Sequence, residues 1–176
     1  MKSIANMNEA ELSAYIQSHL KNAGIDVVLS GGSAVTIYSE NKYVSKDLDL
    51  VNVYAANRKK IKTAMTKLGF QEEGRYFTHA KTKLFIEFPA GPLAIGEEPV
   101  KEIVEKEMPT GTLRIISPTD CVKDRLAAYY HWSDRQCLVQ AQYVSQAQAV
   151  DLKEVRAWSE REGMLAKFEE IKKELK

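Results

Sequence analysis

Apolar positions near the start of the chain recur at the spacing of a helix. Asn8 followed by Glu11 is typical of an N-cap with its reciprocal glutamate, and apolar residues from Leu12 to Leu20 then repeat every three to four positions. This pattern predicts a first helix that ends near Gly24.

The period then changes to that of strands. Residues 25–30, IDVVLS, form a short β-branched run that ends at glycines, which indicates a buried strand. Residues 31–33, GGS, precede a short helical segment at 34–39. In residues 47–53, DLDLVNV, polar and apolar positions alternate, which predicts a strand with its aspartates on one face and its leucines on the other.

The middle of the chain reads as one helix followed by several strands. An amphipathic helix is predicted at 57–68, capped by Asn57 and closed by Gly69. The strands predicted after it lie at 70–73, 76–80, 83–88 and 113–116, with a loop at 89–96.

From Ser117 onward the pattern is helical. Ser117 and Pro118 suit the start of a helix, and the helical segments lie near 119–132, 135–148, 152–162 and 165–175. We therefore expect an α/β (α+β) chain, with a core at residues 1–116 and a C-terminal helical region at 117–176.

Composition and charge narrow the class of protein. The chain has 176 residues, of which 44% are hydrophobic and 28% charged, and it contains no apolar run of the length that spans a membrane. The N-terminal residues lack the apolar core and cleavage site of a secretory signal. These features predict a cytoplasmic protein with no membrane contact, whose two cysteines, Cys121 and Cys137, are free and buried.

The net charge of +1 gives no general argument for binding nucleic acid. A local basic cluster at Arg58, Lys59, Lys60 and Lys62 is a candidate patch, although such runs are more often solvated helix faces.

The aspartates of DLDL are the first candidates for chemistry. Asp47 and Asp49 point to the same side of a strand, about 6 to 7 Å apart, so both carboxylates can reach one or two cations. The three histidines are scattered, and an all-oxygen donor set suits Mg²⁺, or Mn²⁺, rather than a softer metal.

The glycine turn is the second candidate. Gly31, Gly32 and Ser33 lie between a strand and a helix, where exposed backbone N–H groups and the helix dipole favour an anion such as a phosphate. Each motif alone is a weak signal, because GGS turns and DLD strand edges are common. Together they suit a site for a metal–nucleotide complex.

A glycine–serine pair, a gap of about a dozen residues and then Asp-apolar-Asp-apolar resembles the signature of the nucleotidyltransferase superfamily typified by DNA polymerase beta. The resemblance covers residues 25–88 and implies a mixed β-sheet flanked by helices. It also implies transfer of a nucleoside monophosphate from a nucleoside triphosphate to an acceptor hydroxyl on protein, RNA or a small molecule. Members commonly supply a third carboxylate from a later strand, here Glu87, with Glu72 and Glu73 as weaker candidates.

The chain also resembles small bacterial AbiEii-like nucleotidyltransferases associated with toxin–antitoxin loci or phage defence. That likeness implies a lysine on a following helix, here Lys123, as a further contact to the triphosphate, and makes Asp134 a candidate for a later acidic position. A homo-oligomer or a cognate toxin or antitoxin partner follows as an expectation.

Three alternatives stay open. The chain can keep the fold without catalysis, as an antitoxin-like protein that binds a nucleotide or a partner. Arg125 and His131 resemble the pair of HEPN ribonucleases, but Leu126 stands where that family usually has a polar residue. A structural module could use the glutamine-rich helix at 135–148 as a partner surface.

Overall fold

The structure, a computed structural model, describes residues 2–175. Its α-helices are α1 (Glu9–Asn22), α2 (Gly31–Tyr38), α3 (Arg58–Lys67), α4 (Pro118–Trp132), α5 (Arg135–Ala147), α6 (Leu152–Arg161) and α7 (Leu165–Ile171), with short 3-10 helices η1 (Ile4–Asn6) and η2 (Lys172–Leu175). Its strands are β1 (Val27–Ser30), β2 (Asp47–Asn52), β3 (Gln71–Glu73), β4 (Tyr76–Thr78), β5 (Phe85–Glu87), β6 (Ala94–Ile95), β7 (Glu98–Pro99), β8 (Ile103–Met108) and β9 (Gly111–Ile116).

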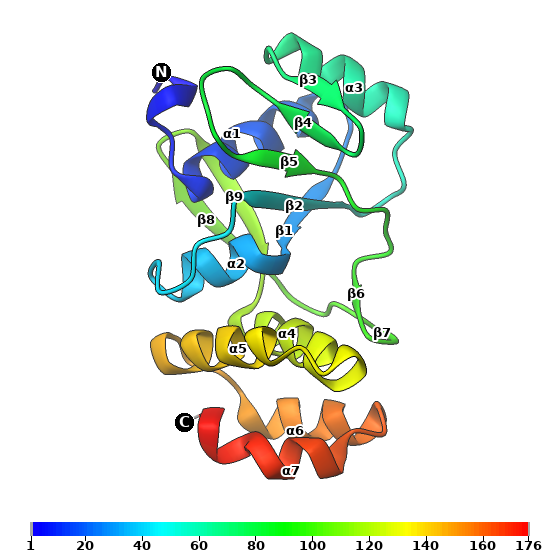
Figure 1. Cartoon of the computed structure of the whole chain (residues 1–176). Coiled ribbons are helices and arrows are strands. Elements are labelled where there is room, and N and C mark those ends of the chain that lie inside the picture. The colour runs from blue at the N-terminus through cyan, green and yellow to red at the C-terminus, as the bar shows by residue number, and fades with distance from the viewer. Residues whose placement is uncertain (1, 176) are drawn as a thin grey trace.

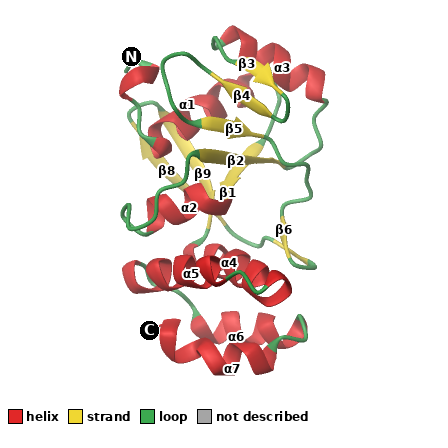
Figure 2. Ribbon diagram, in the orientation of Figure 1, coloured by secondary structure: helices red, strands yellow, loops and turns green. Residues whose placement is uncertain are grey.

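The main sheet has the strand order β3-β4-β5-β2-β1-β9-β8. The pairs β2–β5 and β1–β9 are parallel, whereas the other neighbouring pairs are antiparallel. The predicted mixed sheet flanked by helices is therefore confirmed. Figure 2 shows the strands of this sheet gathered in the upper half of the molecule, with a helical half below them.

The helices cover the sheet in a defined order. Figure 1 shows α4 and α5 lying between α2 and the outer pair α6 and α7, and α1 beside the strands β8 and β9. Hydrogen bonds join these layers: the Tyr38 hydroxyl donates to the Ile116 carbonyl at 2.8 Å, and the Gln148 amide donates to the Tyr38 carbonyl at 2.9 Å. Strand β9 ends at Ile116 and α4 begins at Pro118; a division into two domains at this point stays a prediction.

The helix starts read from the sequence are present. The Asn8 side chain accepts from the Glu11 backbone N–H at 2.9 Å, and the Glu11 carboxylate accepts from the Asn8 N–H at 3.0 Å. The Asn57 side chain caps α3 by accepting from the Lys59 N–H, and the Ser117 side chain caps α4 by accepting from the Asp120 N–H. Helix α2 begins at Gly31, three residues earlier than expected, because Gly31 and Gly32 already adopt the first turn.

The sequence reading missed three strands. Strand β8 carries charged residues at Glu105, Lys106 and Glu107, and it lies at the edge of the sheet, paired only with β9. An edge strand with one solvated face lacks the apolar run that marks a buried strand. The expected loop at 89–96 and the residues after it hold the small hairpin β6–β7, which is too short for its pattern to be recognised.

Within residues 2–175, no helix combines the length and apolar character needed to cross a membrane. Cys121 and Cys137 are both free and buried, as expected from the sequence.

Packing under β2 holds the acidic strand in place. Leu48 is 0% exposed and lies on the face opposite Asp47 and Asp49. Leu48→Ala should lower the free energy of unfolding by about 2–5 kcal/mol, because it leaves a cavity in a closed core. Val44→Ala, at a side chain that is 60% exposed, should change it by less than about 0.5 kcal/mol. Urea denaturation measures both, and equal effects would contradict the assigned faces.

Candidate active site

The two aspartates lie on one face of β2. Along this strand the leucines Leu48 and Leu50 are fully buried, whereas Asp47 and Asp49 are only partly buried on the other side. Among residues 2–175, neither carboxylate has a hydrogen-bond donor or an ion-pair partner. Two acids on one strand face without a cation are unusual, since like charges repel and a partly buried charge normally acquires a partner.

Glu87 lies beside this pair. Strand β5 runs parallel to β2, and its register places Glu87 directly opposite Asp49. The Glu87 carboxylate also lies 3.7 Å from the guanidinium of Arg75, an exposed side chain. Strand pairing therefore brings the three predicted acids onto neighbouring positions of the sheet.

The weaker candidates lie on the edge strand β3, two strands away from β5. Glu72 is paired with Lys62 and Arg58, and their hydrogen bonds hold the pKa of its carboxyl below the ordinary value. Glu73 accepts from the Thr78 hydroxyl at 2.9 Å. Neither residue shares the register of Asp49.

Crowding changes the protonation of Asp49. The pKa of the Asp49 carboxyl is raised to about 6, by burial first and then by the negative charges of Glu87 and Asp47, against the opposing charge of Arg125. Desolvation and like charges both favour the neutral form of a carboxyl group. A bound cation would reverse this effect by neutralising the group.

The GGS turn lies directly against the acids. Gly31 has a φ of +65°, and a Cβ at this position would overlap the Asp49 carboxylate. Glycine is required here for two reasons, because its φ is left-handed and because Asp49 occupies the space of a side chain. The close contact between Gly31 and Asp49 thus sets the position of the turn relative to β2.

Ser33 has a different environment from the one expected. Its side chain is 0% exposed, and its hydroxyl donates to the Asp47 backbone carbonyl. Gly32 is also buried, against Ser45 and Tyr43. In this arrangement Ser33 holds β2 to α2, and its hydroxyl does not face an open site; a phosphate contact from Ser33 stays a prediction.

A cavity of about 330 Å³ opens beside Asp49 and Gly31. One wall is apolar and comes from residues 89–95 with Val100, and the opposite wall includes Asp124 and Arg125 of α4. The Arg125 guanidinium lies 2.5 Å from the Asp124 carboxylate and 3.3 Å from the Gln140 carbonyl oxygen. The cavity therefore combines Asp49 from the sheet with a partly buried ion pair from α4.

Sequence reasoning did not place Asp124 and Arg125 at this site. The available signal was a charged dipeptide within a mostly apolar helix, but only the packing of α4 shows which face meets β2. Six positions along a helix turn by about 240°, so Arg125 and the exposed His131 point in different directions. This geometry disfavours the ribonuclease pair.

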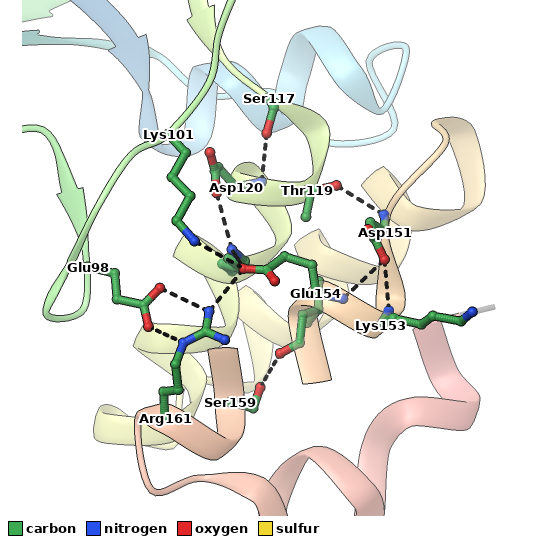
Figure 3. Close-up of polar contacts among 12 residues, drawn as sticks. Glu98, Lys101, Ser117, Thr119, Asp120, Asp151, Lys153, Glu154, Ser159 and Arg161 are labelled. Carbon is green, nitrogen blue, oxygen red and sulfur yellow. Dashed lines mark hydrogen bonds and ion pairs between the residues drawn. The ribbon is translucent and has the colours of Figure 1, made fainter. Parts of the chain in front are cut away.

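Lys123 does not line the cavity beside Asp49. Its side chain is buried, with Nζ 2.9 Å from Glu154 and 3.5 Å from Asp120. Figure 3 shows these two acids with Lys101, Glu98 and Arg161. Glu154 also accepts from Arg161 at 3.0 Å, and Arg161 binds both oxygens of Glu98 on β7. Lys123 thus belongs to an ion network between α4, α6 and the β6–β7 hairpin; its predicted contact with a triphosphate has no support from this placement.

The other expected acidic position also has a local role. Asp134 is the N-cap of α5, accepting from the backbone N–H groups of Gln136 and Cys137 at 2.9 and 3.3 Å.

Comparison with known proteins defines the fold. No protein-family model and no curated protein sequence matches the chain. The chain is similar to an antigenic nucleotidyltransferase-like protein from Paracoccidioides brasiliensis, with a TM-score of 0.64, 11% identity and coverage of 95% of this chain and 91% of that one. It is also similar to ANT(2″)-Ia, solved in complex with adenylyl-2″-tobramycin, with a TM-score of 0.51, 14% identity and coverage of 89% and 94%. At these identities the likeness establishes a nucleotidyltransferase fold.

The contact between Gly31 and Asp49 gives a sharp test. Gly31→Ala should lower the free energy of unfolding by about 1–2 kcal/mol for the left-handed backbone, plus a further cost of about 1–3 kcal/mol for displacing Asp49. Gly74→Ala is the matched control, since its φ is +61° but no atom lies within 4 Å of the added Cβ. Thermal or urea unfolding measures both, and equal losses would argue against the close contact.

Lys123 should act as a structural cation. Lys123→Met leaves Asp120 and Glu154 without their buried partner and should cost about 2–3 kcal/mol of unfolding free energy. The control Lys101→Met removes an exposed lysine 3.9 Å from the same Glu154 and should cost less than about 1 kcal/mol. A Lys123→Met protein with unchanged stability would refute this role.

Proposed function

We propose that this protein is a metal-dependent nucleotidyltransferase that moves a nucleoside monophosphate from a nucleoside triphosphate to an acceptor hydroxyl. One observation carries the proposal: among residues 2–175, Asp47 and Asp49 have no side-chain partner on their face of β2, and Asp49, opposite Glu87, lines an open cavity. The nucleotidyltransferase fold supports the same activity.

The donor chemistry fits Mg²⁺ or Mn²⁺. Asp47, Asp49 and Glu87 would hold the metal, since hard divalent ions take carboxylate oxygens. No three His, Cys, Asp or Glu side chains in residues 2–175 already converge as a complete ligand set. In this structure the three carboxylates therefore do not form a closed ligand set, and Mg²⁺ bound by one or two of them would take its other ligands from water and substrate phosphates.

When bound, the metal supplies charge neutralisation for the triphosphate and the attacking oxygen. The chain supplies position. Leu48 and Leu50 fix the β2 backbone, so that both aspartates stay on the cavity side. The missing side chain at Gly31 leaves room for Asp49. Positioning and electrostatics account for most of the catalysis in phosphoryl transfer.

The order of bonds follows from this reaction class. The acceptor hydroxyl attacks the α-phosphate in line, and the bond to pyrophosphate breaks. Glu87, on the neighbouring strand, is the acid we place nearest the incoming hydroxyl. The backbone at Gly31 and Gly32, at the start of α2, lies at the positive end of a helix dipole, where the outer phosphates gain stabilisation.

The nucleotide donor and the acceptor of the transfer are suggested by one structural neighbour. The adenylyl-2″-tobramycin bound to ANT(2″)-Ia supports ATP as the first donor to test and a small-molecule hydroxyl as one acceptor class, beside protein and RNA. A cytoplasmic location and a toxin or antitoxin partner stay predictions, which co-purification from the native cell would test.

A second function has its own support. The Ser33 hydroxyl is committed to the Asp47 carbonyl, and Glu87 lies near Arg75, so the site could bind a nucleotide or a partner without turnover. Calorimetry with ATP and Mg²⁺ that shows tight binding, together with no product under any condition, would favour this inactive form.

The aspartates give the direct test of catalysis. Asp47→Asn or Asp49→Asn should reduce transfer at least about a hundredfold, because each removes a charge that holds the metal. The fold should survive, since each substitution also relieves repulsion within the acidic cluster. Incubation with each nucleoside triphosphate, Mg²⁺ and a cell extract, followed by mass spectrometry of the products, measures transfer.

The matched control is Glu73→Gln, which removes one negative charge from the edge strand and should leave transfer unchanged. Chelation of divalent ions should abolish transfer by the natural protein. Full activity of either aspartate variant, or transfer that persists without divalent ions, would refute the mechanism.

A further inference from the structure

A second and larger cavity, of about 570 Å³, lies between the end of α1 and one face of α3. We call it the α1–α3 groove, and its lining residues are His19, Asn22, Ala23, Asn57, Lys59, Lys60, Thr63, Ala64 and Lys67. Three of them are lysines and none is acidic. None of them lines the cavity beside Asp49.

The charge of α3 is divided between two sides. The helix sequence RKKIKTAMTK contains no acidic residue. Arg58 and Lys62 share one acidic partner, Glu72, at 2.8 and 3.0 Å. In contrast, Lys59 and Lys67 have no ion-pair partner among residues 2–175, and the same holds for Lys60. Most of the uncompensated charge of α3 therefore lies on the side of the groove.

This arrangement does not serve the stability of the helix. Lys59 and Lys60 lie in the first turn of α3, where the helix dipole is positive and favours acids over lysines. Lys60 gains some compensation, because its Nζ reaches across the groove to Gly24, next to the negative end of α1. Residues that break a local rule without a local gain often mark a functional surface.

The spacing of the lysines selects the type of ligand. Lys59 and Lys67 are eight positions apart, which corresponds to about 12 Å along the helix axis. A single phosphate cannot contact both ends, whereas a chain of phosphodiesters can. Asn22 adds a polar side chain to the lining, whereas the Asn57 side-chain oxygen accepts from the Lys59 N–H and the Thr63 hydroxyl donates to the Lys59 carbonyl.

We propose that the α1–α3 groove binds the phosphodiester backbone of single-stranded nucleic acid. The lysines supply a charge attraction that does not depend on sequence, and their spacing along α3 matches a chain of phosphates. The proposal is independent of catalysis, since it requires neither a metal nor a nucleotide at Asp49.

The test measures the fluorescence anisotropy of a labelled single-stranded oligonucleotide of about twelve nucleotides as the full-length protein is added. The solution contains neither Mg²⁺ nor free nucleotide. RNA and DNA oligonucleotides of the same sequence are tested separately, to show which of the two the groove binds. The variant is Lys59→Gln with Lys60→Gln and Lys67→Gln. It should bind at least about tenfold more weakly, and the slope of log Kd against log salt should fall by about 2, because about 0.7 counterions are released per phosphate contact.

The matched control is Lys81→Gln with Lys153→Gln and Lys173→Gln, which removes the same charge from exposed positions elsewhere. It should change the Kd by less than about twofold if the groove, and not the net charge, binds the strand. Replacing the three groove lysines by arginine should keep the affinity, and circular dichroism should show an unchanged fold in all variants.

Three results would overturn the proposal: no binding of either oligonucleotide by the natural protein, equal losses in the groove and control variants, or loss of binding in the arginine variant. Because no step uses Asp47 or Asp49, a negative result here leaves the proposed transfer reaction untouched.

Discussion

Repulsion among neighbouring carboxylates is the constraint around which this molecule is organised. Asp47, Asp49 and Glu87 occupy adjacent positions of two parallel strands, and the partly buried Asp49 has its pKa raised to about 6, by burial first and then by its acidic neighbours. An arrangement with this cost persists only where the surrounding fold enforces it. Leucines on the opposite face of β2 and the close contact with Gly31 provide that enforcement.

The C-terminal helices complete the site that the sheet begins. Helix α4 brings Asp124 and Arg125 to the cavity, and the segment before β6 supplies the apolar wall. The hairpin is held in two ways, since Arg161 binds Glu98 and the Glu162 carboxylate accepts from the Glu97 N–H at 3.0 Å. The ion network in Figure 3 thus holds the β6–β7 hairpin next to the cavity. Its charged side chains do not line the cavity themselves.

A net charge of +1 hides two regions of opposite sign. Acids gather at β2 and β5, whereas α3, which follows β2 in the chain, carries five basic residues and no acid. Mixed charges that cancel in the total can still give strong local potentials. A metal–triphosphate complex and a phosphodiester strand are both anionic overall, yet each suits a different one of these regions, because the first brings its own cations.

The sequence by itself determined the local features of this protein. Alternation in DLDL places both aspartates on one face, Asn8 and Ser117 define helix starts, and the glycine pair marks the tight turn before α2. Each follows from the period of a single element or from the geometry of a few adjacent residues. The glycine–serine and Asp-Leu-Asp pattern was also enough to indicate the nucleotidyltransferase fold.

Only the tertiary structure decided which of these faces meet. Parallel pairing of β2 with β5 puts Glu87 opposite Asp49, and helix packing brings Arg125 to the cavity. The same packing places Lys123, two residues earlier, in an ion network. Strand β8 exists as a strand because β9 supplies its hydrogen-bond partners. Contacts between residues far apart in the chain depend on the packing of the whole core, and the spacing within one segment carries no information about them.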